Sequence, residues 1–150
     1  MREILFRAKT VKNVNWIWGD LFRAGTEPSD GEFSISYWDD EDGWMNENVQ
    51  PATIGQFTGL TDKNGKRIFE GDIVECVSWN EYFSNPETGE VMQPFRRKMY
   101  VDFRKGGFKM VEPMPEPMKD NEWDIICNGD IVVIGNIHDD PQLIEMKRLG

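Results

Sequence analysis

The chain has 150 residues, a length that fits one domain or two small, closely packed sub-domains. Its formal net charge of −10 argues against a protein that coats nucleic acid or an anionic membrane, and no apolar run is long enough to cross a bilayer. The N-terminal residues lack the apolar stretch of a signal peptide, so we expect a soluble protein of the cytoplasm.

Alternation of apolar and polar residues predicts strands in the first third of the chain. The clearest period of two lies at residues 32–37, where Phe33, Ile35 and Tyr37 alternate with polar residues, as a strand with one buried face requires. Further strands are expected at residues 3–9 and 14–22, and turns at residues 25–31 and 39–43.

Two glycine-containing segments predict hairpins. The Asn-Gly pair at residues 64–65 is the stronger signal, because both central residues of a type I′ turn need positive φ. Residues 99–103 alternate before the Gly-Gly pair at 106–107, and residues 108–110 return beyond it. We therefore expect a tight turn at each pair.

The remaining segments complete a mostly β pattern. Three prolines in residues 112–122 forbid a central strand and predict an extended exposed loop, and residues 80–94 are expected as an inserted loop. The Asp-Pro pair at residues 140–141 supplies an N-cap and a first-turn proline for one short helix through Leu143 and Met146. Short strands are expected at residues 73–79, 125–126 and 131–134. This pattern predicts an all-β barrel or sandwich with one minor helix.

Three blocks of sequence resemble the YopX family of bacteriophage and prophage proteins. They are residues 2–8 (REILFRA), 57–74 (FTGLTDKNGKRIFEGDIV) and 133–143 (VIGNIHDDPQL), and they stand in the order of that family. The resemblance implies an N-terminal β region over residues 1–55 joined to an SH3-like barrel over residues 56–150. It implies no catalytic residues, since members are described as phage proteins of unknown function. The two long loops depart from the plainer members.

The residues offer little for catalysis or metal binding. His138, the one histidine, precedes Asp139 and Asp140, but a metal site needs three or four converging ligands. We expect a turn in which one of these carboxylates caps the helix. Cys76 and Cys127 are expected as free thiols, given the cytoplasmic location. We therefore expect no metal, no cofactor and no enzymatic activity.

Positive charge gathers in residues 96–109, where six bases accompany one acid, Asp102. On a strand, Lys98, Tyr100, Asp102 and Arg104 would face outward, opposite Met99, Val101 and Phe103. This basic hairpin is the candidate nucleic-acid surface, with Tyr100 as a stacking ring. Alternatively, its bases neutralise nearby acidic loops. The candidate residues are Arg96, Arg97, Lys98, Tyr100, Arg104, Lys105 and Lys109.

Six tryptophans allow two interpretations. They could line a ligand groove, but we expect each to be a core residue, with Trp38 and Trp44 the least certain to be buried. The leading function is a non-catalytic phage or prophage accessory protein that binds a macromolecule, such as a host or phage protein. The alternatives are nucleic-acid binding through the basic hairpin and an acidic decoy that mimics DNA. Exposed strand edges would also favour a homo-oligomer.

Overall fold

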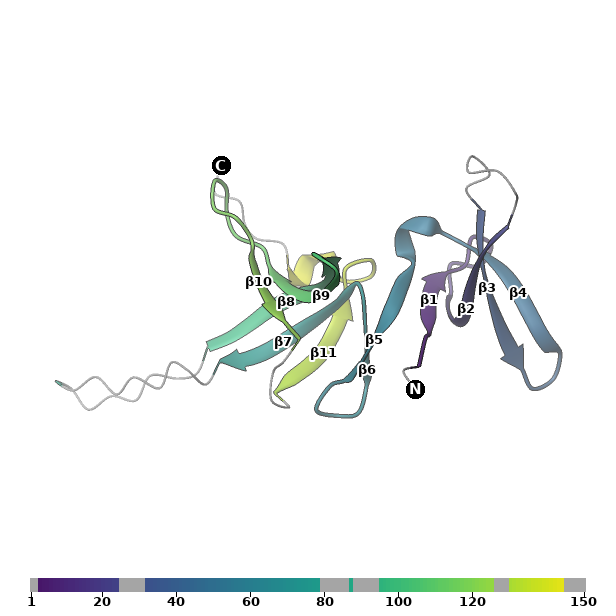
Figure 1. Ribbon diagram of the computed structural model, residues 1–150, viewed down its shortest axis with the longest axis horizontal. Coiled ribbons are helices and arrows are strands. Elements are labelled where there is room, and N and C mark those ends of the chain that lie inside the picture. The colour runs from purple at the N-terminus through teal and green to yellow at the C-terminus, as the bar shows by residue number, and fades with distance from the viewer. Residues whose placement is uncertain (1–2, 25–31, 79–86, 88–94, 126–129, 145–150) are drawn as a thin grey trace. The chain divides into compact units, whose positions relative to one another are not determined.

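The computed structural model describes residues 3–24, 32–78, 87, 95–125 and 130–144. Strands of two antiparallel sheets make up most of these residues, which confirms the all-β prediction (Figure 1). The chain divides into unit 1, residues 1–60 and 67–70, and unit 2, residues 61–66 and 71–150. None of the helices in the described ranges is long and apolar enough to cross a membrane.

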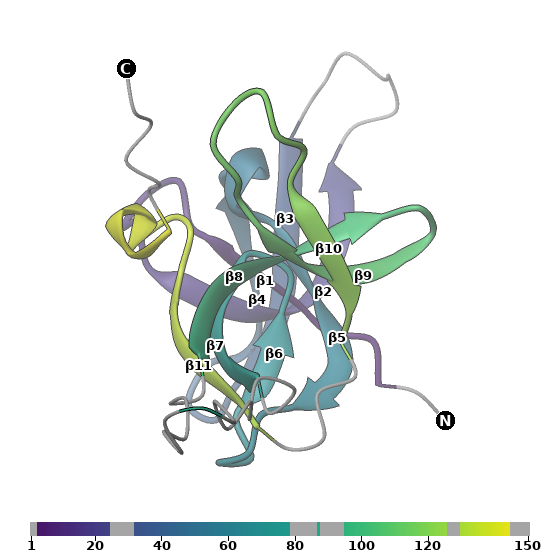
Figure 2. The same cartoon turned by 90° about the vertical axis from the view of Figure 1, so that its left-hand side faces the viewer.

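Unit 1 is built on a six-stranded sheet with the order β4-β3-β2-β1-β5-β6. Its strands are labelled in Figure 2. Strand β1 pairs with both β2 and β5, β2 pairs with β3 and β3 pairs with β4, all antiparallel, and a bridge between Thr10 and Val49 links the end of β1 to the end of β4. The strands are β1 (Phe6–Lys9), β2 (Trp16–Ala24), β3 (Glu32–Asp39), β4 (Gly43–Val49), β5 (Gly55–Thr61) and β6 (Arg67–Phe69). The boundary expected between residues 55 and 56 lies at the start of β5, which pairs with β1.

One face of the unit 1 sheet carries a hydrophobic core. Ala8, Ile35 and Val49 are buried at its centre. The period of two at residues 32–37 accounts for this placement, because it directs Phe33 and Ile35 to the same side of β3. The half-buried residues packed around the centre are Phe6, Ile17, Leu21, Phe33 and Ile54.

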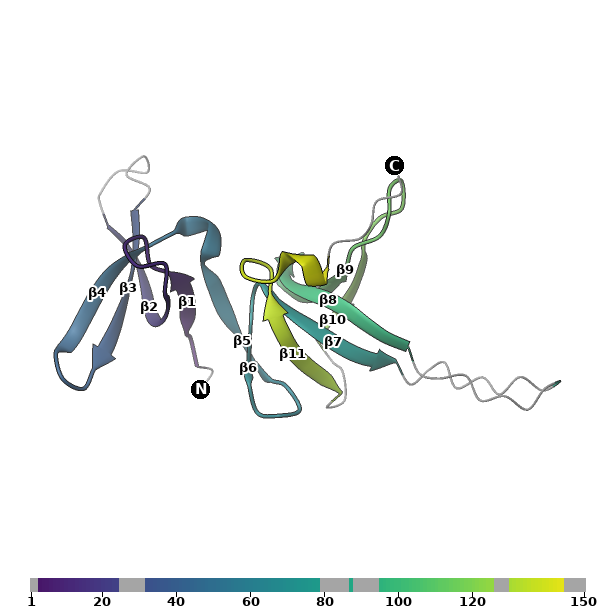
Figure 3. The same cartoon turned by 180° about the vertical axis from the view of Figure 1, so that it is seen from behind.

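Unit 2 contains a five-stranded sheet with the order β10-β9-β8-β7-β11 (Figure 3). The strands are β7 (Asp72–Ser78), β8 (Phe95–Arg104), β9 (Gly107–Glu112), β10 (Asn121–Asp124) and β11 (Ile131–Asn136). The buried hydrophobic residues on these strands are Ile73, Val74, Cys76, Met99, Val101, Met110, Val111 and Ile131. These pairings establish an antiparallel sheet and leave the SH3-like barrel unconfirmed.

Two expectations for the second half of the chain were wrong. Strand β10 occupies residues 121–124, at the end of the expected loop, because these residues pair with β9. The short helix is absent from the described residues, where a 3₁₀ turn at Pro141–Leu143 follows Asp140. Residues 145–150 lie outside the described part, as does the expected loop 80–94 apart from Glu87.

Competing hydrogen bonds explain why Asp140 does not cap a helix. Its carboxylate accepts the backbone N–H of Asn136, at 3.2 Å, and makes no cap bond. The side-chain oxygen of Asn136 accepts the N–H groups of His138 and Asp139, at 3.0 and 2.9 Å. The segment is therefore a turn, as expected, but Asn136 organises it and Asp140 makes no cap bond.

The turn at residues 62–66 is not type I′, because Gly65 has positive φ (81°) and Asn64 does not. Asp62 organises it instead: one carboxylate oxygen accepts the N–H groups of Asn64 and Lys66, at 2.8 and 2.9 Å. A pair of central residues with positive φ does occur at Lys105 and Gly106, as a type I′ turn requires.

Asp62 also joins this turn to the unit 2 sheet. Its second carboxylate oxygen accepts the N–H of Val133 on β11, at 3.0 Å, and the side chain is buried. Burial acts to raise the pKa of Asp62, but the three backbone N–H groups favour the charged form and leave the pKa below its ordinary value.

We expect Gly65→Val to destabilise the protein by about 1–2 kcal/mol, because a β-branched residue resists positive φ. A Cβ at Gly65 meets no atom within 4 Å, so the effect would come from the backbone and not from a clash. Urea unfolding measures it, with Lys63→Val in the same turn as control. Equal stability of the two variants would contradict the turn geometry.

We expect Asp62→Asn to destabilise the protein at neutral pH by about 1–3 kcal/mol, since an amide nitrogen cannot accept the bonds made by a carboxylate oxygen. A lowered pKa stabilises the fold above about pH 4, and this contribution is lost as pH falls through the folded-state pKa. The difference between the two proteins should therefore shrink below about pH 4. Denaturant titrations at several pH values test this, with the exposed Asp40→Asn as control. A constant difference would refute it.

Candidate binding surfaces

Strands β2, β3 and β4 place tryptophans on the sheet face opposite the core of unit 1. Trp16, Trp18 and Asp20 share one face of β2 by alternation, while Ile17 and Leu21 pack on the core. Trp38 on β3 pairs directly with Trp44 on β4. We call Trp16, Trp18, Trp38 and Trp44 the aromatic surface.

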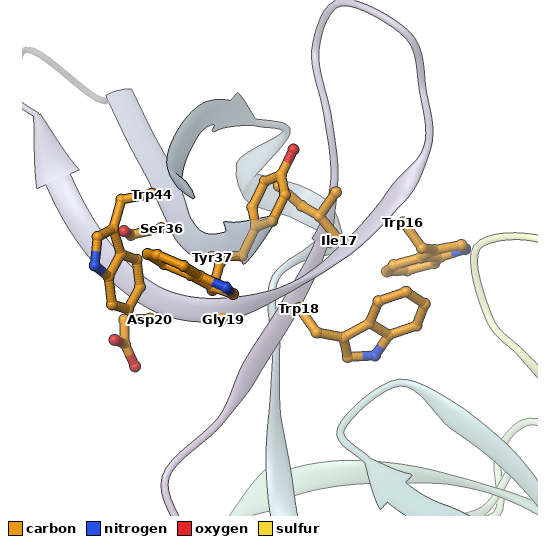
Figure 4. Close-up of a pocket in the computed structure, with 9 residues that line it drawn as sticks. Trp16, Ile17, Trp18, Gly19, Asp20, Ser36, Tyr37 and Trp44 are labelled. Carbon is orange, nitrogen blue, oxygen red and sulfur yellow. The ribbon is translucent and has the colours of Figure 1, made fainter. Parts of the chain in front are cut away.

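The aromatic surface is open to solvent. Relative exposure is 49% for Trp18, 59% for Trp38 and 67% for Trp44, and Trp16 is half-buried. These residues line a hollow of about 420 Å³ together with Ile17, Gly19, Asp20, Ser36 and Tyr37. Figure 4 shows Trp16 and Trp18 at one end of the hollow and Trp44 with Asp20 at the other.

The expectation that each tryptophan is a core residue was therefore wrong for Trp18, Trp38 and Trp44. Trp123 in unit 2 is also exposed, and Trp79 lies outside the described residues. Trp38 and Trp44, which flank the acidic turn, are the two most exposed of the described tryptophans. The period of two identifies two faces of a strand but does not say which of them is covered.

Gly19 allows the close approach of β2 and β3 beneath the hollow. A Cβ at this position would lie 2.1 Å from the backbone oxygen of Ser36. A larger residue would push the two strands apart and separate Trp18 from Trp38. The glycine thus helps to shape the aromatic surface, a role that the sequence analysis missed.

The end of the aromatic surface near the β3–β4 turn is acidic. The rings of Trp38 and Trp44 meet edge to face, with centroids 5.5 Å apart. Between them in sequence lies the acidic turn, residues 39–42, in which the Asp39 carboxylate accepts the N–H groups of Glu41 and Asp42, at 2.8 and 3.0 Å. The expected solvated turn is confirmed, with Asp40, Glu41 and Asp42 exposed.

The opposite end of the aromatic surface carries cations. The Arg7 guanidinium lies 4.9 Å from the ring centroids of both Trp16 and Phe69, and Lys9 Nζ lies 5.5 Å from that of Trp16. These are cation–π distances. The surface is therefore polarised, with cations stacked on Trp16 and carboxylates beside Trp38 and Trp44.

The basic hairpin has the predicted orientation in unit 2. Met99 and Val101 are buried, whereas Lys98 is exposed and Tyr100 and Arg104 are half-buried. The exception is Phe103, which was expected in the core but is 53% exposed and packs edge to face on Phe108.

Acidic residues, all but Asp102 on neighbouring strands, pair with most of the bases. Arg104 lies 2.9 Å from Asp102 and 2.8 Å from Glu122, and these bonds raise its pKa. The Arg104 bond in turn lowers the pKa of Glu122. The other pairs are Arg96–Glu75 at 3.0 Å, Arg97–Glu112 at 3.9 Å, Lys105–Glu122 at 3.3 Å and Lys109–Asp124.

This pairing matches the alternative in which the bases neutralise acids of the same protein. The partners Glu75, Glu112, Glu122 and Asp124 come from β7, β9 and β10, so the run of bases in the sequence does not reveal them. Nucleic-acid binding through the basic hairpin stays a prediction.

Within the described ranges, no group of three or more His, Cys, Asp or Glu residues gathers as metal ligands do. Cys76 is buried, and Cys127 lies outside these ranges.

Two comparisons connect the chain to known proteins. A family model described as "YopX protein" matches residues 5–145. A similar solved chain is titled "Crystal structure of protein EF1440 from Enterococcus faecalis"; it is 23% identical, the match covers 97% of this chain and 100% of that one, and the TM-score is 0.49. No curated protein matches.

We expect Trp44→Ala to cost less than about 1 kcal/mol of unfolding free energy, because the ring is mostly in solvent and its contact with Trp38 is exposed. Ile35→Ala, at the buried centre of the same sheet, should cost about 2–5 kcal/mol. Urea unfolding of both variants gives the comparison. A loss at Trp44 as large as that at Ile35 would show that the ring stabilises the fold.

Proposed function

The chain belongs to the YopX family, and we propose that it is a non-catalytic module that binds a macromolecule through the aromatic surface of unit 1. The observation that carries this proposal is the exposure of Trp18, Trp38 and Trp44 on one sheet face. A fold gains little from tryptophans left in water, whereas exposed aromatic clusters mark interaction sites and tryptophan dominates interface energies.

The chemistry of the described residues supports binding in preference to catalysis. His138 is the one histidine in the chain, and it lies in a turn of unit 2. The carboxylates of its neighbours Asp139 and Asp140 accept hydrogen bonds from Asn136. The aromatic surface belongs to unit 1 and offers rings, hydroxyls and carboxylates. Such groups hold a partner, but they supply no activated nucleophile.

Several parts of the proposal follow from the family resemblance. They are an accessory role in a phage or prophage, a place in the cytoplasm of the bacterial host, a host or phage protein as partner, and an SH3-like barrel within residues 56–150. A homo-oligomer is compatible with the same surface, because a second copy could also cover exposed aromatic rings.

Nucleic-acid binding through the basic hairpin is the second candidate. Arg96, at 73% side-chain exposure, and Lys105, at 80%, present cations to solvent although each has an acidic neighbour. We rank it second because the cross-strand carboxylates offset this charge before any phosphate arrives. The acidic decoy ranks third, on the net charge alone.

We expect a captured partner to depend on the aromatic surface. The wild-type protein and a Trp38→Ala, Trp44→Ala double variant are each immobilised and exposed to bacterial lysate, and retained proteins are identified by mass spectrometry. A specific partner should be lost from the double variant because the exposed rings supply its contacts.

The matched control is Phe103→Ala, which removes an exposed aromatic ring from unit 2. It should retain the partner. Equal capture by all three proteins, or loss of the partner with Phe103→Ala only, would overturn the proposed site.

A further inference from the structure

We propose that the partner presents a cationic protein segment, whose Arg or Lys side chains lie on Trp38 and Trp44 and pair with the carboxylates of Asp20 and the acidic turn. This inference rests on the proposed function of the aromatic surface. It adds the chemistry of the occupant, which exposure of the rings does not specify.

Charge complementarity is the first support. The sequence from residue 27 to 47 holds eight acids and no base. Of these, the acidic turn separates Trp38 from Trp44, and its Asp40, Glu41 and Asp42 are exposed. Asp20 adds an exposed carboxylate to the lining of the same hollow. An arriving cation would thus find aromatic faces and negative charge side by side.

The protein already uses this chemistry within its own fold. Arg7 and Lys9 lie over Trp16, and Arg97 lies 5.4 Å from the ring centroid of Trp123. In the part of the chain that the structure describes, no cation lies over the rings of Trp18, Trp38 or Trp44. The cation–π position on Trp16 is thus occupied by Arg7 and Lys9, whereas the equivalent positions on Trp38 and Trp44 are open to a cation from a partner.

The carboxylates disfavour other occupants. A phosphate backbone would be repelled by Asp20 and the acidic turn, although bases could stack on the rings. A purely apolar segment would desolvate these carboxylates without pairing them, which is costly. A cationic segment makes cation–π contacts with the rings and ion pairs with the carboxylates.

Arginine fits this surface better than lysine. Its planar guanidinium is weakly hydrated and can stack on an indole while it donates hydrogen bonds to a carboxylate in its own plane. The asymmetry has a parallel inside unit 1, where the Arg7 guanidinium lies over two rings and Lys9 over one.

The test titrates a short peptide of alternating Arg and Gly into the purified full chain, followed by tryptophan fluorescence and calorimetry. Peptides with citrulline or Glu in place of Arg, and a single-stranded DNA oligonucleotide, are the comparison probes. Citrulline keeps the shape of Arg without its charge. We expect saturable binding of the Arg peptide, weakening with salt, and none of the comparison probes to bind.

Variants separate site binding from general attraction to an acidic protein. The Trp38→Ala, Trp44→Ala double variant should bind the Arg peptide about tenfold more weakly, as two exposed cation–π contacts imply. Asp20→Asn should also weaken it, whereas Asp124→Asn, an equal change of net charge in unit 2, should not. Phe103→Ala should bind as the wild type does.

The inference is overturned if the Arg peptide does not bind, if the citrulline peptide binds equally well, if the double variant binds like the wild type, or if Asp124→Asn weakens binding as much as Asp20→Asn does. Binding of the oligonucleotide through Trp38 and Trp44 would overturn it in favour of nucleic acid. None of these results decides the lysate experiment, so a macromolecular partner of other chemistry would leave the proposed function standing.

Discussion

The alternation of side chains along β2, β3 and β4 is the constraint that shapes unit 1. Once Ile17, Leu21 and Ile35 enter the core, their neighbours must emerge on the opposite face of the strand. Trp18 and Trp38 cannot reach that core without a one-residue shift in register, which would expose Ile17 and Ile35 in exchange. The exposure of the tryptophans is thus fixed by the same pairing that buries the core.

Sequence pattern predicted the parts of the fold that depend on local alternation. The strand at residues 32–37 and the outward face of β8 follow from a period of two, and the all-β class follows from many such segments. The pattern did not predict the elements whose structure depends on pairing with residues distant in the sequence. The polar residues Asn121–Asp124 form a strand because they pair with β9, and Glu122 meets Arg104 across 18 positions of sequence. No local pattern contains that information.

The geometry of the turns was predicted wrongly for a different reason, because side-chain hydrogen-bond acceptors compete there with the glycine and proline signals. The Asn-Gly pair predicts two residues with positive φ, but the buried carboxylate of Asp62 binds the N–H groups of Asn64 and Lys66 and imposes another geometry. In the same way, Asn136 organises the turn before Pro141 by accepting the N–H groups of His138 and Asp139, and Asp140 makes no cap bond. In both cases a side-chain acceptor upstream of the expected signal controls the turn.

The two charged regions of the chain differ in how their charge is balanced. The bases of the basic hairpin meet Glu75, Asp102, Glu112, Glu122 and Asp124 within unit 2. The chain has an excess of 27 − 17 = 10 acids, and eight acids without a base lie in residues 27–47. Most of the net charge thus belongs to the stretch that contains both Trp38 and Trp44. A charge balanced internally stabilises its own sheet, whereas one left beside exposed aromatic rings is available to a partner. A cationic partner would therefore be stabilised most at the acidic end of the aromatic surface.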